Sequence, residues 1–280
     1  MSETLPGTET TTLKTCCATL YESDWAHLLL GESFHPGGLT LTQRLGELLG
    51  LGPGQRLLDV AAGRGTSAIF LSQRFGCEVV GVDYGADMVA QATALAVGAG
   101  LADRVRFEQG DAERLRFADK TFDAVICECA FCTFPDKPSA AAEFARVLRP
   151  GGQVGLSDLT RVGPLPPELE TLLAWIACIA DARPVGDYIS YLEDAGLVTD
   201  RAEPHDDAVV DMIKDVRTKL LGAELLVKLR KIDLPQADFE QAKALARSAA
   251  DTVQRGKLGY ALIVASKVGG QRPPLSETDR

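Results

Sequence analysis

The chain has 280 residues, 46% of them hydrophobic, and a formal net charge of −10 at pH 7. This length and apolar content suit one large α/β domain or one domain with an insertion. The acidic balance argues against binding of a nucleic-acid backbone, which needs a basic surface. A run of about 18 apolar residues is absent, so we expect no membrane-spanning segment, and the polar, acidic N-terminal residues favour a cytoplasmic protein.

Residues 1–38 are expected to form an N-terminal arm that precedes the folded core. The arm contains Cys16, Cys17 and His35, and it ends in the turn Pro36-Gly37-Gly38. From residue 39 to 160 the hydrophobic pattern alternates between the periods of helices and strands. The expected elements, in chain order, are a helix at 39–49, a strand at 56–61, a helix at 66–74, a strand at 78–82, a helix at 86–98, strands at 104–108 and 122–126, a helix at 138–148 and a strand at 153–158. This alternation predicts an α/β fold, with a doubly wound and mostly parallel sheet.

The alternation stops after Asp158, where prolines at 164, 166 and 167 interrupt the chain. Residues 161–256 are expected to form a helical cap and acceptor region over the carboxyl edge of the sheet. Within it we expect helices at 167–180, 185–195 and 207–256, and a returning strand near 198–205. Residues 257–267 are predicted to form a closing strand that pairs with the returning strand as an antiparallel hairpin, followed by a tail at 268–280.

A glycine-rich turn follows the first predicted strand. Asp59 stands near the end of that strand, and Gly63-Arg64-Gly65-Thr66-Ser67-Ala68 comes next. Asp83 stands at the end of the second strand. Glycines let backbone N–H groups approach a ligand, and a carboxylate at this strand end accepts hydrogen bonds from ribose hydroxyls. The pattern therefore predicts a nucleoside site, and by itself it also fits a dinucleotide fingerprint.

Further motifs narrow this prediction. A carboxylate at Asp59 would repel a pyrophosphate but suits a ligand that carries an ammonium group. The third predicted strand leads into Gly110-Asp111-Ala112, and Leu148-Arg149-Pro150-Gly151-Gly152 precedes the fifth. In this order, residues 40–160 resemble the class I S-adenosylmethionine-dependent methyltransferases, with ubiquinone-biosynthesis-type enzymes among the broader relatives. The resemblance implies a Rossmann-like fold and S-adenosylmethionine as the cofactor.

The resemblance also implies roles for individual residues. Asp59 would face the methionine end of the cofactor, Asp83 would bind both ribose hydroxyls, and Asp111 would contact the adenine ring through its side chain. The further cofactor-binding candidates are Ala61, Gly63 and Gly65 in the turn, Tyr84, Met88 and Ala112 around the adenine, and Cys127.

The cysteines suggest which substrate accepts the methyl group. The chain has seven of them, and the segment after the fourth strand is cysteine-rich. Cys129, followed by Pro135-Asp136-Lys137, and Cys178, preceded by Trp175, resemble the corresponding segments of arsenite methyltransferases. The resemblance implies that Cys129 and Cys178 bind a trivalent metalloid, with Cys16 or Cys17 as a possible third ligand. A soft centre of this kind selects thiolates, so we expect a polar, partly exposed site in which the thiols ionise.

Other interpretations remain open. Glu128 replaces an Asn of the arsenite enzymes, and Cys127 and Cys132 are extra. The acceptor could instead be a small organic molecule methylated on oxygen, nitrogen, sulfur or carbon, with Glu128 or His35 as the base. The cysteines would then be small buried hydrophobic residues, as we expect for Cys77. A cofactor-binding protein without catalysis is a third possibility, and the sequence indicates no oligomeric state.

Overall fold

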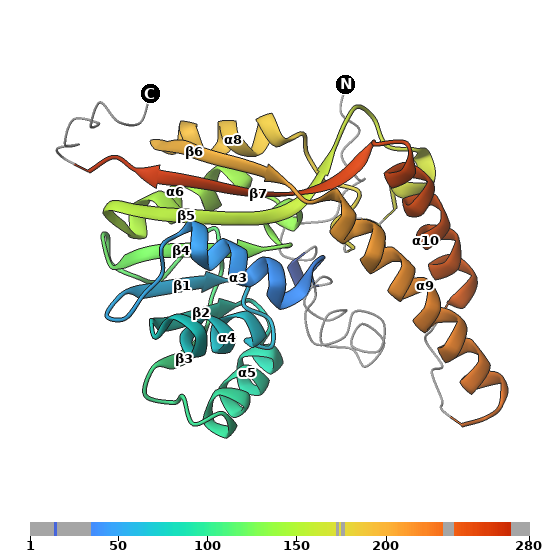
Figure 1. Cartoon of the computed structure of the whole chain (residues 1–280), viewed down its shortest axis with the longest axis horizontal. Helices are drawn as coiled ribbons and strands as arrows, with labels where there is room; N and C mark the ends of the chain where they lie inside the picture. The colour runs from blue at the N-terminus through green and yellow to red at the C-terminus, as the bar shows by residue number, and fades with distance from the viewer. Residues whose placement is uncertain (1–13, 16–34, 172–173, 175–176, 232–237, 270–280) are drawn as a thin grey trace.

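A computed structural model describes residues 14–15, 35–171, 174, 177–231 and 238–269. Its centre is a seven-stranded sheet in the order β3-β2-β1-β4-β5-β7-β6 (Figure 1). The strands are β1 (Arg56–Val60), β2 (Glu78–Asp83), β3 (Val105–Gln109), β4 (Phe122–Glu128), β5 (Leu148–Arg161), β6 (Leu197–Pro204) and β7 (Leu258–Lys267). β7 pairs antiparallel with both β5 and β6, and the other pairs are parallel. The predicted fold class is therefore confirmed.

Helices cover both faces of the sheet. In Figure 1, α3 (Gly38–Leu48), α4 (Thr66–Phe75) and α5 (Ala86–Gly98) lie on the near face, while α6 (Lys137–Val147) and α8 (Val185–Asp194) lie behind it. Central strands buried on both faces need near-continuous apolar runs. β1 and β4 meet this need, since Leu57, Leu58, Val125 and Ile126 are fully buried.

Two expected helices differ from the structure. Among the described residues of 167–180, a short 3-10 turn forms at Pro167–Leu169 and Ala174 is helical, but Cys178 has a φ of 64° that a right-handed helix cannot contain. The long helical region at 207–256 is divided into α9 (Asp206–Lys228) and α10 (Phe239–Gln254). Arg230 has a φ of 56° just beyond α9, and the side chain of Asp238 caps α10 by accepting a hydrogen bond from the backbone N–H of Gln241.

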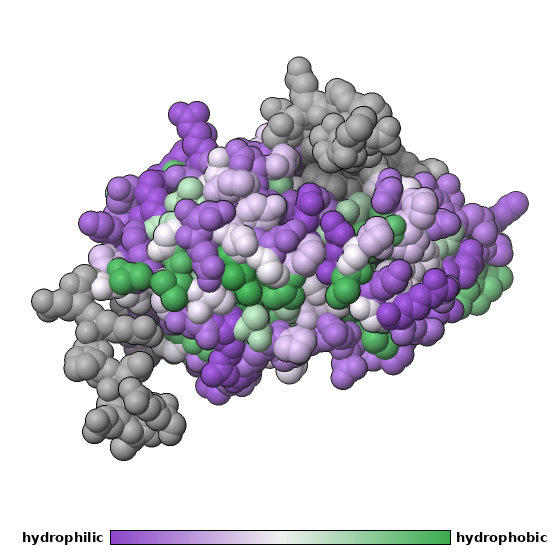
Figure 2. Space-filling view, turned by 90° about the horizontal axis from the view of Figure 1, so that it is seen from above, coloured by the Kyte–Doolittle hydropathy of each residue, from purple (hydrophilic) through white to green (hydrophobic). Residues whose placement is uncertain are grey.

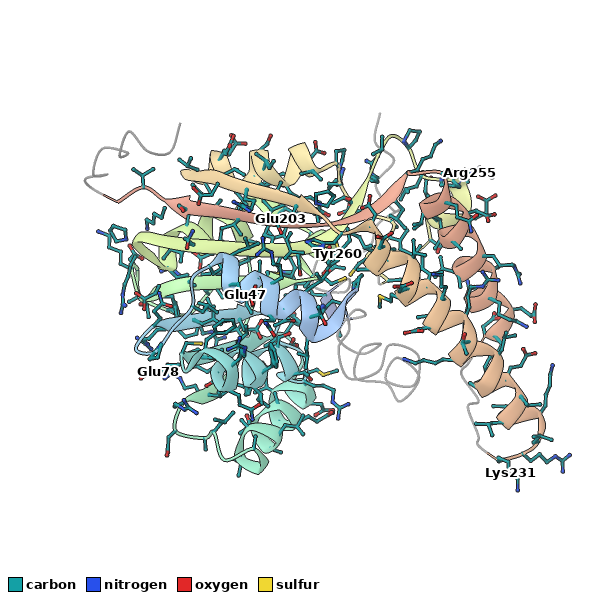
Figure 3. All side chains as sticks on the ribbon, viewed as in Figure 1. Glu47, Glu78, Glu203, Lys231, Arg255 and Tyr260 are labelled. Atoms are coloured by element: carbon teal, nitrogen blue, oxygen red, sulfur yellow. The ribbon has the colours of Figure 1, made fainter. Side chains whose placement is uncertain are left out.

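The α9–α10 pair projects from the sheet on the side where the parallel strands end (Figure 1). Lys231 lies at its far tip, and Tyr260 of β7 lies at its base (Figure 3). On the face seen from above, hydrophobic residues form small groups among hydrophilic ones (Figure 2). Within the described ranges, no helix is both long enough and apolar enough to cross a membrane.

Candidate functional site

A pocket lies beyond the carboxyl ends of β1, β2 and β4. Strand order reverses between β1 and β4, because the chain runs outward from β1 to β3 and then returns to β4 on the other side. Ligands of doubly wound sheets bind in the crevice at this switch point. The pocket is lined by Lys14, His35, Asp59, Ala61, Ala62, Gly63, Arg64, Thr66, Ser67, Val82, Asp83, Tyr84, Met88, Gly110, Asp111, Ala112, Glu128, Cys129, Ala130, Thr133, Phe134 and Pro135.

Most of the residues expected to hold the cofactor face this one pocket. They are Asp59, Ala61, Gly63, Asp83, Tyr84, Met88, Asp111 and Ala112. The acceptor candidates Glu128, Cys129 and His35 line it as well, whereas Cys127 and Cys178 are buried and do not. Cys127 belongs to β4 inside the sheet, so it is a core residue and not the cofactor contact that we expected. Cys16 and Cys17 lie outside the described residues.

The glycine turn is held by Asp83. The backbone N–H of Gly63 donates to Oδ2 of Asp83 over 2.8 Å, and that of Gly85 donates to Oδ1 over 2.8 Å. Both carboxylate oxygens therefore brace loops at the edge of the pocket. A ribose placed here would meet a carboxylate whose position is already fixed.

Gly65 has a different role from the one expected. It precedes α4 with a φ of 76°, and a Cβ on it would lie 2.3 Å from the ring of Phe107 and 3.0 Å from Cβ of Ala92. Gly65 does not line the pocket. It allows the start of α4 to pack closely on neighbouring elements, which corrects the expected cofactor contact.

Asp59 supplies a buried carboxyl group at the pocket. Its side chain is 2% exposed, and among the described residues its Oδ2 has no hydrogen-bond partner. Burial raises the pKa of Asp59 well above its ordinary value, and the nearby carboxylates of Glu128 and Asp83 raise it further. A cationic ligand would offset both effects. The residues present therefore fit a cofactor that carries an ammonium and a sulfonium group.

Glu128 lies at the same end of the pocket within a polar cluster. Ser67 Oγ donates to its Oε2 over 2.6 Å, and Thr42 Oγ1 lies 3.1 and 3.2 Å from its two oxygens. His35 Nε2 lies 3.7 Å from Oε2. The side chain of Glu128 is 5% exposed, so these groups replace most of its water. Sequence reasoning missed Thr42 and Ser67, although Ser67 belongs to the glycine motif.

Lys14 lies at the opposite end of the pocket, next to Asp111. Its Nζ donates to both carboxylate oxygens of Asp111, over 2.9 and 2.8 Å, and to Oε2 of Glu113. Burial lowers the pKa of Lys14, but its hydrogen bonds to these carboxylates outweigh that effect and raise it overall. No sequence signal identified Lys14, because nothing local indicates which carboxylate a lysine of the arm will meet.

The thiols beyond β4 form a buried cluster. Cys178 Sγ donates to the backbone oxygen of Cys129 over 3.0 Å, and the thiols of Cys129 and Cys178 also interact. Cys132 contacts Cys178, and its backbone N–H donates to Oδ2 of the buried Asp158. The pKa values of Cys127 and Cys132 are raised mainly by burial, and that of Cys129 by its hydrogen bond with Cys178 and by burial.

This cluster corrects one expectation. We expected a polar, partly exposed site, but only Cys129 of this group is partly exposed, and the raised pKa values keep the thiols protonated near neutral pH. In the described part of the chain, no three His, Cys, Asp or Glu residues are arranged to hold a metal ion. Cys77 is buried just before β2, with its thiol directed at the backbone oxygen of Leu71, as expected for a core residue.

Lys137 ties the loop after β4 to the segment that precedes α8. It is buried, with its side chain only 4% exposed, and its Nζ donates to the backbone oxygen of Phe134 over 3.1 Å and to Oδ2 of Asp181 over 2.5 Å. The loop that carries Cys129 and Phe134 is thereby held against the segment that carries Cys178.

Comparison with known proteins gives a consistent result. A family model described as a methyltransferase domain matches residues 57–152. The chain is 30% identical to methyltransferase GfsG of Streptomyces halstedii, over 72% of this chain and 78% of that protein. It is 32% identical to 27-O-demethylrifamycin SV methyltransferase of Amycolatopsis mediterranei, over 88% of this chain and 93% of that protein.

The chain is also similar to a solved methyltransferase structure and, over a shorter stretch, to an arsenite methyltransferase. Phosphoethanolamine N-methyltransferase 2 of Haemonchus contortus, in complex with S-adenosylhomocysteine, aligns with a TM-score of 0.78 and 19% identity, over 94% of this chain and 61% of that one. The arsenite methyltransferase of Halobacterium salinarum is 30% identical, but over only 56% of this chain and 41% of that protein. The arsenite enzymes are thus one distant group of relatives and not the best-supported one.

Proposed function

The chain belongs to the class I S-adenosylmethionine-dependent methyltransferases, and we propose that it methylates a hydroxyl group of a small organic molecule, with Glu128 as the proton acceptor. It is an enzyme, and S-adenosylmethionine is its cofactor.

The observation that carries the proposal is the position of Glu128. Its carboxylate lines the pocket beside the buried Asp59, and Ser67, Thr42 and His35 hold it in place. A base held by hydrogen-bonding side chains at a pocket wall is suited to accept a proton from a bound hydroxyl group. The relative from Amycolatopsis mediterranei, which the chain matches over 93% of that protein, acts on 27-O-demethylrifamycin SV. Its name supports a hydroxyl group as the methyl acceptor.

Each residue around the pocket would have its own role in methyl transfer. The cofactor supplies a methyl group bound to a positively charged sulfur. Asp59 and Glu128 place negative charge near this cation, so they favour it over the neutral thioether that remains after transfer. Glu128 would accept the proton that the bound hydroxyl group loses when its oxygen is methylated. Phe134 and Thr133 line the same wall and would help to exclude water.

A thiol-bound trivalent metalloid is a second candidate acceptor, because one observation favours it. Cys129 and Cys178 lie 49 residues apart in the chain, yet Sγ of Cys178 is 3.0 Å from the backbone oxygen of Cys129. Soft metalloids bind neighbouring thiols after displacing their protons. The raised thiol pKa values oppose this step, so we place the metalloid second.

One assay separates the two candidates. The enzyme is given labelled cofactor together with either a panel of phenols and aliphatic alcohols or arsenite with a thiol reductant. We expect product from a hydroxyl compound, a loss of roughly 100-fold or more in Glu128→Gln, and activity retained in Cys178→Ser. Methylated arsenic as the sole product, lost in Cys129→Ser and Cys178→Ser but retained in Glu128→Gln, would instead establish the metalloid.

We also propose that residues 161–256 act as a cap on the acceptor side. The α9–α10 pair projects on the side where the parallel strands end (Figure 1), and closure there would exclude water during transfer. Hydrogen exchange should show stronger amide protection in α9 and α10 when cofactor and acceptor are both bound. Equal protection with and without ligands would contradict the cap.

A further inference from the structure

The cluster around Cys129 holds more thiols than the proposed hydroxyl methylation uses. Cys129 is the member that lines the cofactor pocket, and Cys178 lies directly behind it. Cys178 is 2% exposed, so solvent meets Cys129 first. One accessible thiol backed by one buried thiol is the arrangement in which a first oxidation product can be trapped by a neighbouring thiol.

The backbone holds both cysteines in unusual positions. Cys129 has a φ of 50° and Cys178 a φ of 64°, a region that L-residues other than glycine rarely adopt. The backbone N–H of Cys129 donates to the oxygen of Ser157 over 2.6 Å, which anchors that turn to β5. The ion pair of Lys137 with Asp181 holds the two cysteine-bearing segments together. The two thiols therefore approach each other in a rigid setting.

We propose that Cys129 and Cys178 form a reversible disulfide when the enzyme meets hydrogen peroxide, and that this pair is a redox modification site in the wall of the cofactor pocket. The Cys129 thiolate attacks one peroxide oxygen, which gives a sulfenic acid and, after protonation, one water. The Cys178 sulfur then displaces the hydroxyl group as a second water. Two thiols lose two protons and two electrons, and one peroxide becomes two waters.

The surroundings of Cys129 affect how fast its thiol is oxidised. The hydrogen bond with Cys178 and burial raise the pKa of Cys129, so little thiolate exists at neutral pH and oxidation is slow. The rate should then rise about tenfold for each unit of pH, because the thiolate is the reacting form. A bound cofactor would cover Cys129, since both share the pocket.

Peptide mapping of the whole protein tests the proposal. After peroxide treatment and alkylation of free thiols, we expect a cross-linked peptide that joins Cys129 to Cys178, with the loss of two hydrogens and full reversal by dithiothreitol. S-adenosylhomocysteine at about ten times its dissociation constant should slow cross-linking about tenfold, because only free protein then reacts. Cys77→Ser is the matched control, and its cross-linking should equal that of the wild type.

Cys178→Ser provides the second measurement. Its cross-link should be absent, and Cys129 should then proceed to the sulfinic acid. Binding of S-adenosylhomocysteine, measured before oxidation, shows that this variant is folded. A cross-link from Cys129 to Cys132 in the wild type would overturn the proposal. So would a wild-type protein in which Cys129 becomes sulfinic acid while Cys178 stays alkylatable. Neither result depends on the identity of the methyl acceptor.

Discussion

The Nζ atom of Lys14 lies 2.9 Å from Oδ1 and 2.8 Å from Oδ2 of Asp111, although 97 residues separate them in the chain. The contact places a residue of the N-terminal arm at the end of the pocket where the adenine ring is expected. Lys14 also binds Glu113, and its side chain is 14% exposed. Lys14 and His35, two described residues of the segment 1–38, therefore form part of the pocket wall.

Replacing Lys14 should weaken cofactor binding. Lys14→Ala removes a partly buried cation that neutralises two carboxylates, and we expect a loss of about 1 kcal/mol, or roughly fivefold in affinity for S-adenosylhomocysteine. Calorimetry measures it, and Lys214→Ala is a suitable control because Lys214 is an exposed lysine paired with Asp211 on α9. Tighter binding in Lys14→Ala would mean that the lysine competes with the cofactor for Asp111.

Asp83 should matter more for affinity than for the fold as a whole. Asp83→Ala removes the carboxylate that we expect to bind the ribose, and it frees the N–H groups of Gly63 and Gly85. Loss of a charge-assisted contact costs about 1.5–3 kcal/mol, or roughly 10- to 150-fold in affinity. Asp206→Ala is the control, because Asp206 also accepts a backbone N–H, that of Tyr260, but lies outside the pocket. Unchanged affinity in Asp83→Ala would remove Asp83 from the site.

Gly65 should act through packing. Gly65→Ala places a methyl group against the ring of Phe107 at a φ of 76°, and we expect a loss of about 2–4 kcal/mol in the free energy of unfolding. Gly54 has a φ of 80° but open space around it, so Gly54→Ala should cost only about 1 kcal/mol. Urea denaturation measures both. If the two variants lose equal stability, the contact with Phe107 contributes nothing.

Asp158 should make stability fall as the pH rises. Burial and the nearby Cys178 thiol raise the pKa of Asp158 to about 7, from 3.8 in an unfolded chain. Between these values the folded state holds a proton that the unfolded state has lost, so unfolding becomes easier with increasing pH. The slope is at most about 1.4 kcal/mol per pH unit, and it ends above pH 7.

The variant Asp158→Asn isolates this slope. Chemical denaturation at several pH values between 4 and 7 compares the variant with the wild type. The unfolding free energy of the wild type, relative to that of the variant, should fall as the pH rises, because the amide of the variant does not titrate. The amide can satisfy only one of the N–H groups of Cys132 and Leu159, so absolute stability is not the readout. Parallel curves for the two proteins would place the pKa of Asp158 near its ordinary value.

The carboxylates that line the pocket could be predicted to lie together because their signals are local. Asp59, Asp83 and Asp111 each stand at or just beyond the end of a predicted strand, and parallel strands bring those ends to one edge of the sheet. The alternation of strands and helices, and the closing hairpin at β6 and β7, were predictable for the same reason. Each depends on a periodic pattern within a single short segment.

Tertiary structure alone decided the rest, because it depends on which distant segments pack together. The amino-acid sequence was enough to predict a methyltransferase fold and three carboxylates, Asp59, Asp83 and Asp111, that the structure brings to one pocket. It contained no signal for Lys14 at Asp111, or for Thr42 beside Glu128, since these pairs join segments separated by 97 and 86 residues. It also predicted a helix through Cys178, but packing against Cys129 holds that residue in a turn and buries its thiol. Burial, and with it the protonation of the thiols, is a property of the packed structure that no local pattern specifies.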